Sequence, residues 1–181
     1  MSQSADTYAD LERERNEGGT SLGDEHATLV EFLRCQRLTL RMKCAGLDAE
    51  QLARRSVEPS TMSLLGLVRH LADVEHHWFR NVMAGQDSPR RYSSPEDRDG
   101  EFDGAVPDDA MVAGAWQAWR EEVTFAEQLV AEATDLGVVA DAGRHGRISL
   151  REVLVHMIEE YARHNGHADL LRERIDGRVG E

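Results

Sequence analysis

Two short segments of the sequence concentrate the side chains that most often bind metal ions or transfer protons. Six of the eight histidines lie in them, and the second segment also carries Glu160. The six are His70, His76, His77, His156, His164 and His167. At about 100° per residue, Glu160, His164 and His167 fall within about 80° of His156 on one face of a helix. Imidazole nitrogens beside a carboxylate are typical ligands of zinc and related ions.

The apolar residues of the second segment indicate where this face points. Four of them lie at about 60° to 100° on the same helical wheel, namely Val153, Met157, Leu171 and Ile175. His164 is therefore expected to point into a core, with Glu160 one turn before it and His167 on the flank. Burying a carboxylate beside imidazoles is costly unless its charge is met, and a divalent cation meets it well.

The first segment supplies a possible third ligand, His70, at the edge of an apolar stripe that includes Leu67 and Leu71. If the two helices are neighbours, His70, Glu160 and His164 form a set of two histidines and one carboxylate with open coordination positions. The alternative has no metal. In it, His70 and His164 are histidines at the edge of the core, hydrogen-bonded to residues such as Asp73 or Tyr161. Spacing leaves both interpretations open.

Helical periodicity and helix-capping signals identify the elements that must position these residues. Long helices are expected at about 24–44, 62–84, 110–133 and 149–176, with a short helical turn at 48–54. The last helix opens with a capping box, in which Ser149 precedes Glu152 by three residues. Because no convincing pair of strands is present, the sequence predicts an all-α protein, a four-helix bundle.

The remaining segments define the domain. Residues 1–23 are charged and without periodicity, so they are expected to form a disordered tail in which ADLERER is at most a helical turn. Residues 24–181 form a single domain. Residues 86–109 carry three of the four prolines and many acids, and are expected to be a long loop, either a cover over a binding site or a disordered insertion.

Composition excludes several classes of function. The 181 residues carry 21 Lys and Arg against 34 Asp and Glu, a net charge of −13, which opposes binding to nucleic acid or to anionic membranes. No apolar run approaches the ~18 residues of a membrane span, and residues 1–23 do not resemble a secretion signal, so a cytoplasmic location is expected. Cys35 and Cys44 fall on opposite faces of one helix and predict no disulfide framework.

Two stretches resemble the DinB/YfiT-like superfamily of four-helix proteins, in particular its mini-circle-protein branch of unknown function. They are SLLGLVRHLADVEHHWFRNVMAG and VHMIEEYARHNGHADLLRE, and the resemblance extends over about Asp24 to Asp176. It implies a divalent metal held by one histidine of the second helix and a pair spaced i, i+4 in the last. These positions correspond to His70, Glu160 and His164. Most of the superfamily has His where this chain has Glu160. The related mycothiol-dependent maleylpyruvate isomerases also place Glu there, in the zinc site of their N-terminal domain.

The resemblance further implies an activity. Relatives include thiol S-transferases that use low-molecular-weight thiols such as mycothiol or bacillithiol. We therefore expect a metal-dependent enzyme of detoxification or stress response, with zinc as the metal and nickel as a second option. Its substrates would be a small thiol and an electrophile. His167, where many relatives have Gln, is the expected catalytic residue for proton transfer, with His77 a weaker candidate. Maleylpyruvate isomerase activity is not expected, because those enzymes need a further C-terminal domain.

Two other expectations accompany this one. A homodimer is expected from the resemblance, and weakly from the aromatic-rich helix that carries Trp116 and Trp119. The alternative function is that of a non-catalytic helical protein that uses a metal or buried polar contacts for stability or partner binding. A fourth protein ligand, such as His167, would favour that alternative, because catalytic zinc sites keep a coordination position open.

Overall fold

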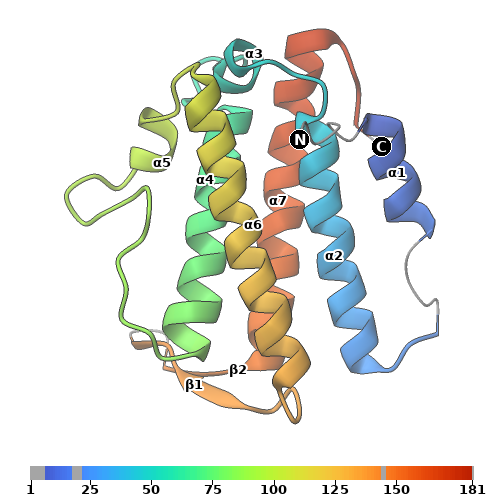
Figure 1. Cartoon of the computed structure of the whole chain (residues 1–181), viewed down its shortest axis with the longest axis vertical. Helices are drawn as coiled ribbons and strands as arrows, with labels where there is room; N and C mark the ends of the chain where they lie inside the picture. The colour runs from blue at the N-terminus through green and yellow to red at the C-terminus, as the bar shows by residue number, and fades with distance from the viewer. Residues whose placement is uncertain (1–6, 18–21, 144–145, 181) are drawn as a thin grey trace.

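Four long helices of the computed structural model pack side by side into a bundle (Figure 1). The structure describes residues 7–17, 22–143 and 146–180. The long helices are α2 (Glu25–Cys44), α4 (Leu64–Glu75) with its continuation as the π-helix η1 (His76–Met83), α6 (Asp109–Glu132) and α7 (Leu150–Asp176). The predicted all-α four-helix bundle is confirmed, and each helix begins and ends close to its expected bounds.

Capping residues fix where the helices begin and end. At the start of α2, the Asp24 carboxylate accepts a hydrogen bond of 2.8 Å from the backbone N–H of Ala27. At the start of α7, Ser149 and Glu152 form the predicted capping box. Gly177 ends α7 in the left-handed conformation, with φ 80°. These contacts satisfy backbone groups that have no partner within the helix, and they set the register of the residues that follow.

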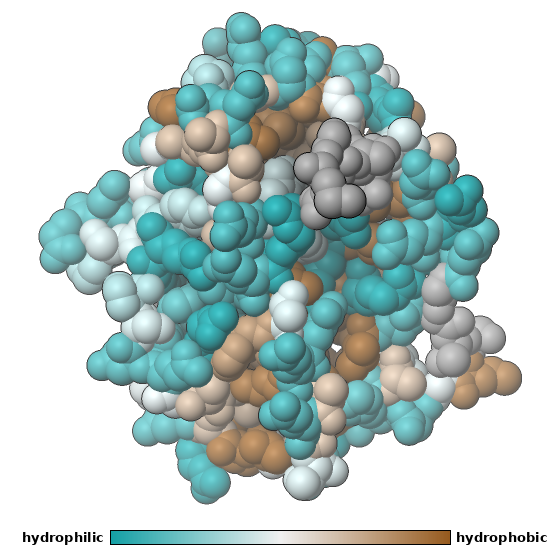
Figure 2. Space-filling view, viewed as in Figure 1, coloured by the Kyte–Doolittle hydropathy of each residue, from teal (hydrophilic) through white to brown (hydrophobic). Residues whose placement is uncertain are grey.

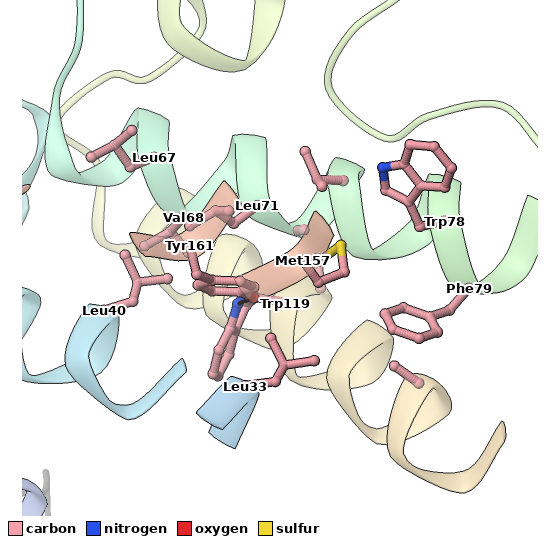
Figure 3. Packing of buried hydrophobic residues seen from close by; sticks show 14 of the residues in the cluster. Leu33, Leu40, Leu67, Val68, Leu71, Trp78, Phe79, Trp119, Met157 and Tyr161 are labelled. Carbon is pink, nitrogen blue, oxygen red and sulfur yellow. Dashed lines mark hydrogen bonds between the residues drawn. The ribbon is translucent and has the colours of Figure 1, made fainter. Parts of the chain in front are cut away.

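A short chain of hydrogen bonds lies in the core of the bundle, and it begins with Trp119 and Tyr161, which Figure 3 shows among the buried hydrophobic residues. The indole N–H of Trp119 donates to the hydroxyl of Tyr161 at 2.8 Å, and this hydroxyl donates to Glu75 Oε1 at 2.8 Å. Trp116 packs edge-on against Trp119, with 5.5 Å between ring centroids. The two tryptophans that weakly favoured a dimer thus pack toward the core. The homodimer stays a prediction that rests on the resemblance.

The N-terminal segment differs from the expected disordered tail. Residues Tyr8–Glu17 form helix α1, and Leu11 is only 3% exposed, in a small cluster with Leu38 and Met42 of α2. A ten-residue amphipathic segment with one anchoring leucine gives a weak sequence signal, and its helix depends on packing against α2. The rest of the expected tail, apart from Thr7, Leu22 and Gly23, lies outside the described residues.

The connections hold more structure than the sequence indicated. The linker before α7 forms an antiparallel hairpin of β1 (Val139–Asp141) and β2 (Arg147–Ser149), where no strands were expected. Strands of three residues are too short to show an alternating pattern. The 48–54 segment forms helix α3 (Ala49–Ala53), as expected. The 86–109 loop contains a short helix, α5 (Gly100–Asp103), which lies beside α4 (Figure 1).

The surface agrees with the acidic, polar composition. Figure 2 shows one face, on which hydrophilic residues predominate and apolar ones appear in small groups. None of the helices in the described part of the chain combines the length and apolar character needed to cross a membrane.

Candidate metal centre

Three side chains from two helices converge on one point. His70 Nε2 of α4 lies 3.1 Å from Glu160 Oε1 of α7, and His164 Nε2 lies 3.3 Å from the same oxygen. The three ligand atoms all lie within 4.8 Å of one another. In a tetrahedral site with bonds of about 2.0–2.1 Å, ligand atoms are about 3.3 Å apart. The three residues therefore fit a divalent ion both in donor type and in spacing.

The helices explain why these residues meet. Glu160 and His164 are one turn apart on α7, so the helical backbone alone keeps them on one face. His70 joins them because α4 packs against α7 at this level. The side chains of His70, Glu160 and His164 are 19%, 22% and 12% exposed, so the site is mostly buried but can be reached from solvent.

No cysteine takes part in this cluster. Among the described residues, the group that could hold a metal consists of His70, Glu160 and His164 alone. Cys44 is buried elsewhere, and burial raises the pKa of its thiol to about 12. Burial and a hydrogen bond to Glu31 also raise the pKa of the Cys35 thiol. A closed zinc site built on thiolates is therefore not available, and three protein ligands leave positions open.

Sequence reasoning missed the partner on the far side of His70. Its second nitrogen, Nδ1, lies 3.1 Å from Glu101 Oε1 of α5, and the ring of Phe102 stacks on the imidazole with 5.4 Å between centroids. Glu101 lies in the irregular 86–109 segment, where no periodic pattern predicts which way a side chain points. The only signal was that a long acidic loop followed the helix of His70.

The partners suggested for a metal-free arrangement lie elsewhere. The Asp73 carboxylate accepts hydrogen bonds from the backbone N–H groups of residues 91–93. The Tyr161 hydroxyl bonds to Glu75 in the core. Both proposed partners were wrong, because each faces a different neighbour. His70 is held instead by Glu101 and Glu160.

The surrounding charges determine the protonation states. Burial opposes the charged form of His70, but the hydrogen bonds to Glu101 and Glu160 outweigh it and raise its pKa to about 9. Hydrogen bonds from His164 and His70 lower the pKa of Glu160 far below its usual range. Two carboxylates around one imidazole thus favour a positive charge between them, either a proton on His70 or a bound cation.

The expected catalytic residue, His167, lies next to the cluster and outside it. Its Nδ1 lies 3.3 Å from Nδ1 of His164, the nitrogen that does not face Glu160. Burial, followed by the nearby His164 and Arg163, lowers the pKa of His167. A half-buried imidazole that stays neutral near pH 7 is suited to accept a proton.

The other histidines of the two segments are not part of the cluster. His156 packs its ring edge-on against Trp78, with 4.8 Å between centroids. His77 also packs against Trp78, at 5.2 Å. His76 is buried and faces Ser88 and Glu122 on the α6 side. These contacts agree with packing roles.

The bundle and the His-Glu-His cluster between two of its helices define a protein of the DinB/YfiT-like superfamily, whose members typically bind a metal. A sequence model described as mycothiol-S-transferase matches residues 28–177, and the chain belongs to this family. No curated protein matches the chain.

A solved structure supports the fold. The crystal structure of a conserved protein from Enterococcus faecalis is similar with a TM-score of 0.56. It is 16% identical in sequence, and the alignment covers 83% of this chain and 96% of that one. At this identity the likeness concerns the fold alone.

Proposed function

We propose that the protein is a metal-dependent mycothiol S-transferase of detoxification or stress response, in which His70, Glu160 and His164 hold the metal. The observation that carries the proposal is the convergence of three ligand atoms within 4.8 Å in a partly exposed site. Family membership supplies the thiol. Zinc is the preferred ion, with nickel as the second choice, because imidazole and carboxylate ligands suit these ions better than Mg²⁺ or Ca²⁺.

The chemistry requires a thiolate near neutral pH. A divalent ion, when bound, supplies a Lewis acid that lowers the pKa of a thiol. In the proposed reaction His167 accepts the thiol proton at Nε2, because its Nδ1 faces His164. A sulfur–carbon bond then forms at the electrophile, and the bond to the leaving group breaks. His167 then gives the proton to a basic leaving group, or to solvent where the leaving group is a halide, which balances the reaction.

The position of His167 also bears on the non-catalytic alternative. A structural metal site is expected to have four protein ligands. His167 contacts the outer nitrogen of His164 and does not belong to the ligand cluster. This geometry favours an open site and hence an enzyme.

The test is elemental analysis of protein grown with zinc and nickel, followed by conjugation of mycothiol to a reactive haloarene. We expect about one metal per chain, and conjugation that needs both the metal and mycothiol, with glutathione as the comparison thiol. His164→Ala should remove both metal and activity, whereas His156→Ala should retain both. A wild-type protein without metal, or equal activity after metal removal, would contradict the proposal.

A further inference from the structure

The Glu101 carboxylate is buried without a full set of hydrogen bonds. The residue is 5% exposed, and its Oε1 contacts His70 Nδ1 at 3.1 Å. Its Oε2 is buried without a hydrogen-bond partner among the described residues. A buried carboxylate with one unsatisfied oxygen destabilises a fold. The contact with His70 is therefore the feature that accounts for an acid at this position.

The turn of α4 that carries His70 also holds the backbone of Glu101. The guanidinium of Arg69 donates to the carbonyl oxygens of Gly100 at 2.8 Å and Glu101 at 2.9 Å. The same guanidinium lies over the ring of Tyr92, 4.3 Å from its centroid. Because Arg69 and His70 are adjacent, the contact between His70 and Glu101 does not depend on any distant element.

One turn further along α4, Asp73 fixes the start of the segment. Its carboxylate accepts hydrogen bonds from the backbone N–H groups of residues 91–93, at 2.7 to 3.2 Å, and from the Ser93 hydroxyl. Close packing completes the attachment. A Cβ added at Gly66 would lie 2.7 Å from the Phe102 ring. The 86–109 segment is thus bound to α4 at several points, as a fixed wall of the site.

From these contacts we infer that Glu101 is a positioning residue of the metal centre, acting through His70. Its carboxylate accepts the proton on Nδ1, so that Nε2, which faces Glu160, is the nitrogen that can give up its proton and offer a lone pair to a metal. A carboxylate behind a ligating histidine fixes the tautomer and ring orientation and makes the nitrogen a better ligand. The inference rests on the proposed metal site and adds a fourth residue, from the connecting loop, to those that build it.

The first test compares zinc dissociation constants, measured by competition with a chelator, for the full chain and its variants. Glu101→Ala should weaken binding by about 10–100-fold, the usual effect of losing such a partner. Glu101→Gln, which keeps an oxygen acceptor but no charge, should fall between Glu101→Ala and wild type. Asp103→Asn is the matched control. This carboxylate lies in the same short helix but pairs with Arg55 at 2.9 Å, so its loss should leave zinc affinity unchanged.

The second test reads the contact itself by NMR in the metal-free protein. A proton held between His70 Nδ1 and a buried carboxylate should give a downfield, slowly exchanging resonance in wild type and Asp103→Asn. It should vanish in Glu101→Ala.

The outcomes separate this inference from the proposed function. Absence of the resonance in wild type, zinc affinity of a folded Glu101→Ala within twofold of wild type, or zinc affinity of Glu101→Gln equal to wild type would overturn the positioning role. A wild-type protein that shows the resonance but binds no metal would overturn the proposed function and this role with it.

Discussion

Two histidine–carboxylate clusters are centred on His70 and His76, less than two turns apart along the same helical run, yet they are built in opposite ways. The His70 cluster consists of His70, Glu160 and His164. Within the described ranges, neither Glu160 nor Glu101 behind it pairs with a lysine or arginine. In the ion pairs of the described residues both carboxylates contact only imidazoles, so no lysine or arginine neutralises them by direct contact.

The His76 cluster consists of His76, Glu122, Arg80 and Arg91. Glu122 is fully buried, and its two oxygens accept hydrogen bonds from Arg80 and Arg91. His76 Nδ1 stands further off, at 3.5 Å from Glu122. Two guanidinium groups already neutralise this carboxylate, and arginine stays charged at all relevant pH values.

The difference indicates which cluster needs a cation. The Glu122 carboxylate forms an internal ion pair with two arginines, and this pair holds α6 against η1 and the 86–109 segment. A carboxylate met by imidazoles can exchange their protons for a metal ion, because imidazole has a lone pair to offer once it is neutral. Similar residue types on one helical run therefore form an internal ion pair in one place and the proposed metal site in the other.

The largest expected effect is on metal binding by His164→Ala. This change removes a ligand that shares Glu160 Oε1 with His70, so zinc binding should fall by more than the about 10–100-fold that loss of an outer partner costs. Equilibrium dialysis with zinc measures it, and His156→Ala should bind as wild type does. Stoichiometric zinc in His164→Ala would remove the distinction between the clusters.

Glu122→Gln is expected to lower the stability of the protein and to leave zinc affinity unchanged. Loss of this charge leaves Arg80 and Arg91 without their partner, and the unfolding free energy should fall by about 2–3 kcal/mol. This expected loss is below the about 3–5 kcal/mol typical of breaking a buried ion pair, because the side chains of Arg80 and Arg91 are 24% and 36% exposed. Urea unfolding with a chelator present measures the change, and zinc affinity should be unaffected.

The pH dependence provides the check on Glu122. Burial opposes its ionisation, but hydrogen bonds from Arg80 and Arg91 lower its pKa below the ordinary 4.5. Its contribution to stability is therefore present above pH ~4.5 and is lost as the pH falls through the folded-state pKa. The difference in unfolding free energy between wild type and Glu122→Gln should be constant from pH 7 to 5 and should become smaller below pH 5. A gap that widened in acid would contradict the ion-pair assignment.

An intermediate effect is expected for Glu160→Gln. The amide keeps the shape but not the charge, so zinc affinity should drop by about tenfold or more. The metal-free protein should lose less stability than Glu122→Gln does, because the two partners of Glu160 are imidazoles that can give up their protons, whereas the arginines beside Glu122 stay charged. Titration calorimetry and urea unfolding measure the two quantities. A larger loss of stability than in Glu122→Gln would reverse the comparison.

The sequence could predict the convergence of those proposed ligands whose positions helical geometry governs. Glu160 and His164 are one turn apart, so their shared face follows from the helix alone, and the apolar stripe placed His70 at a core edge. Glu101 could not be found in this way, because it lies 31 residues from His70 in a segment without periodicity. The pairing of Glu122 with two arginines from other elements likewise depends on tertiary packing. Long, periodic helices were predictable, whereas the hairpin, α1 and the outer contacts of the site were not.

The smallest expected effect separates the folding of α7 from the binding function of its residues. Ser149→Ala removes the hydroxyl that accepts from the backbone N–H of Glu152, and loss of such a cap costs about 1 kcal/mol. Glu160 and His164 lie about three and about four turns further along, where backbone hydrogen bonds hold them on one face regardless of the cap. Urea unfolding should therefore record the loss while zinc affinity stays within twofold of wild type. A parallel loss of zinc affinity would mean that the site depends on the whole of α7, and the local pre-organisation argued from the spacing of Glu160 and His164 would be wrong.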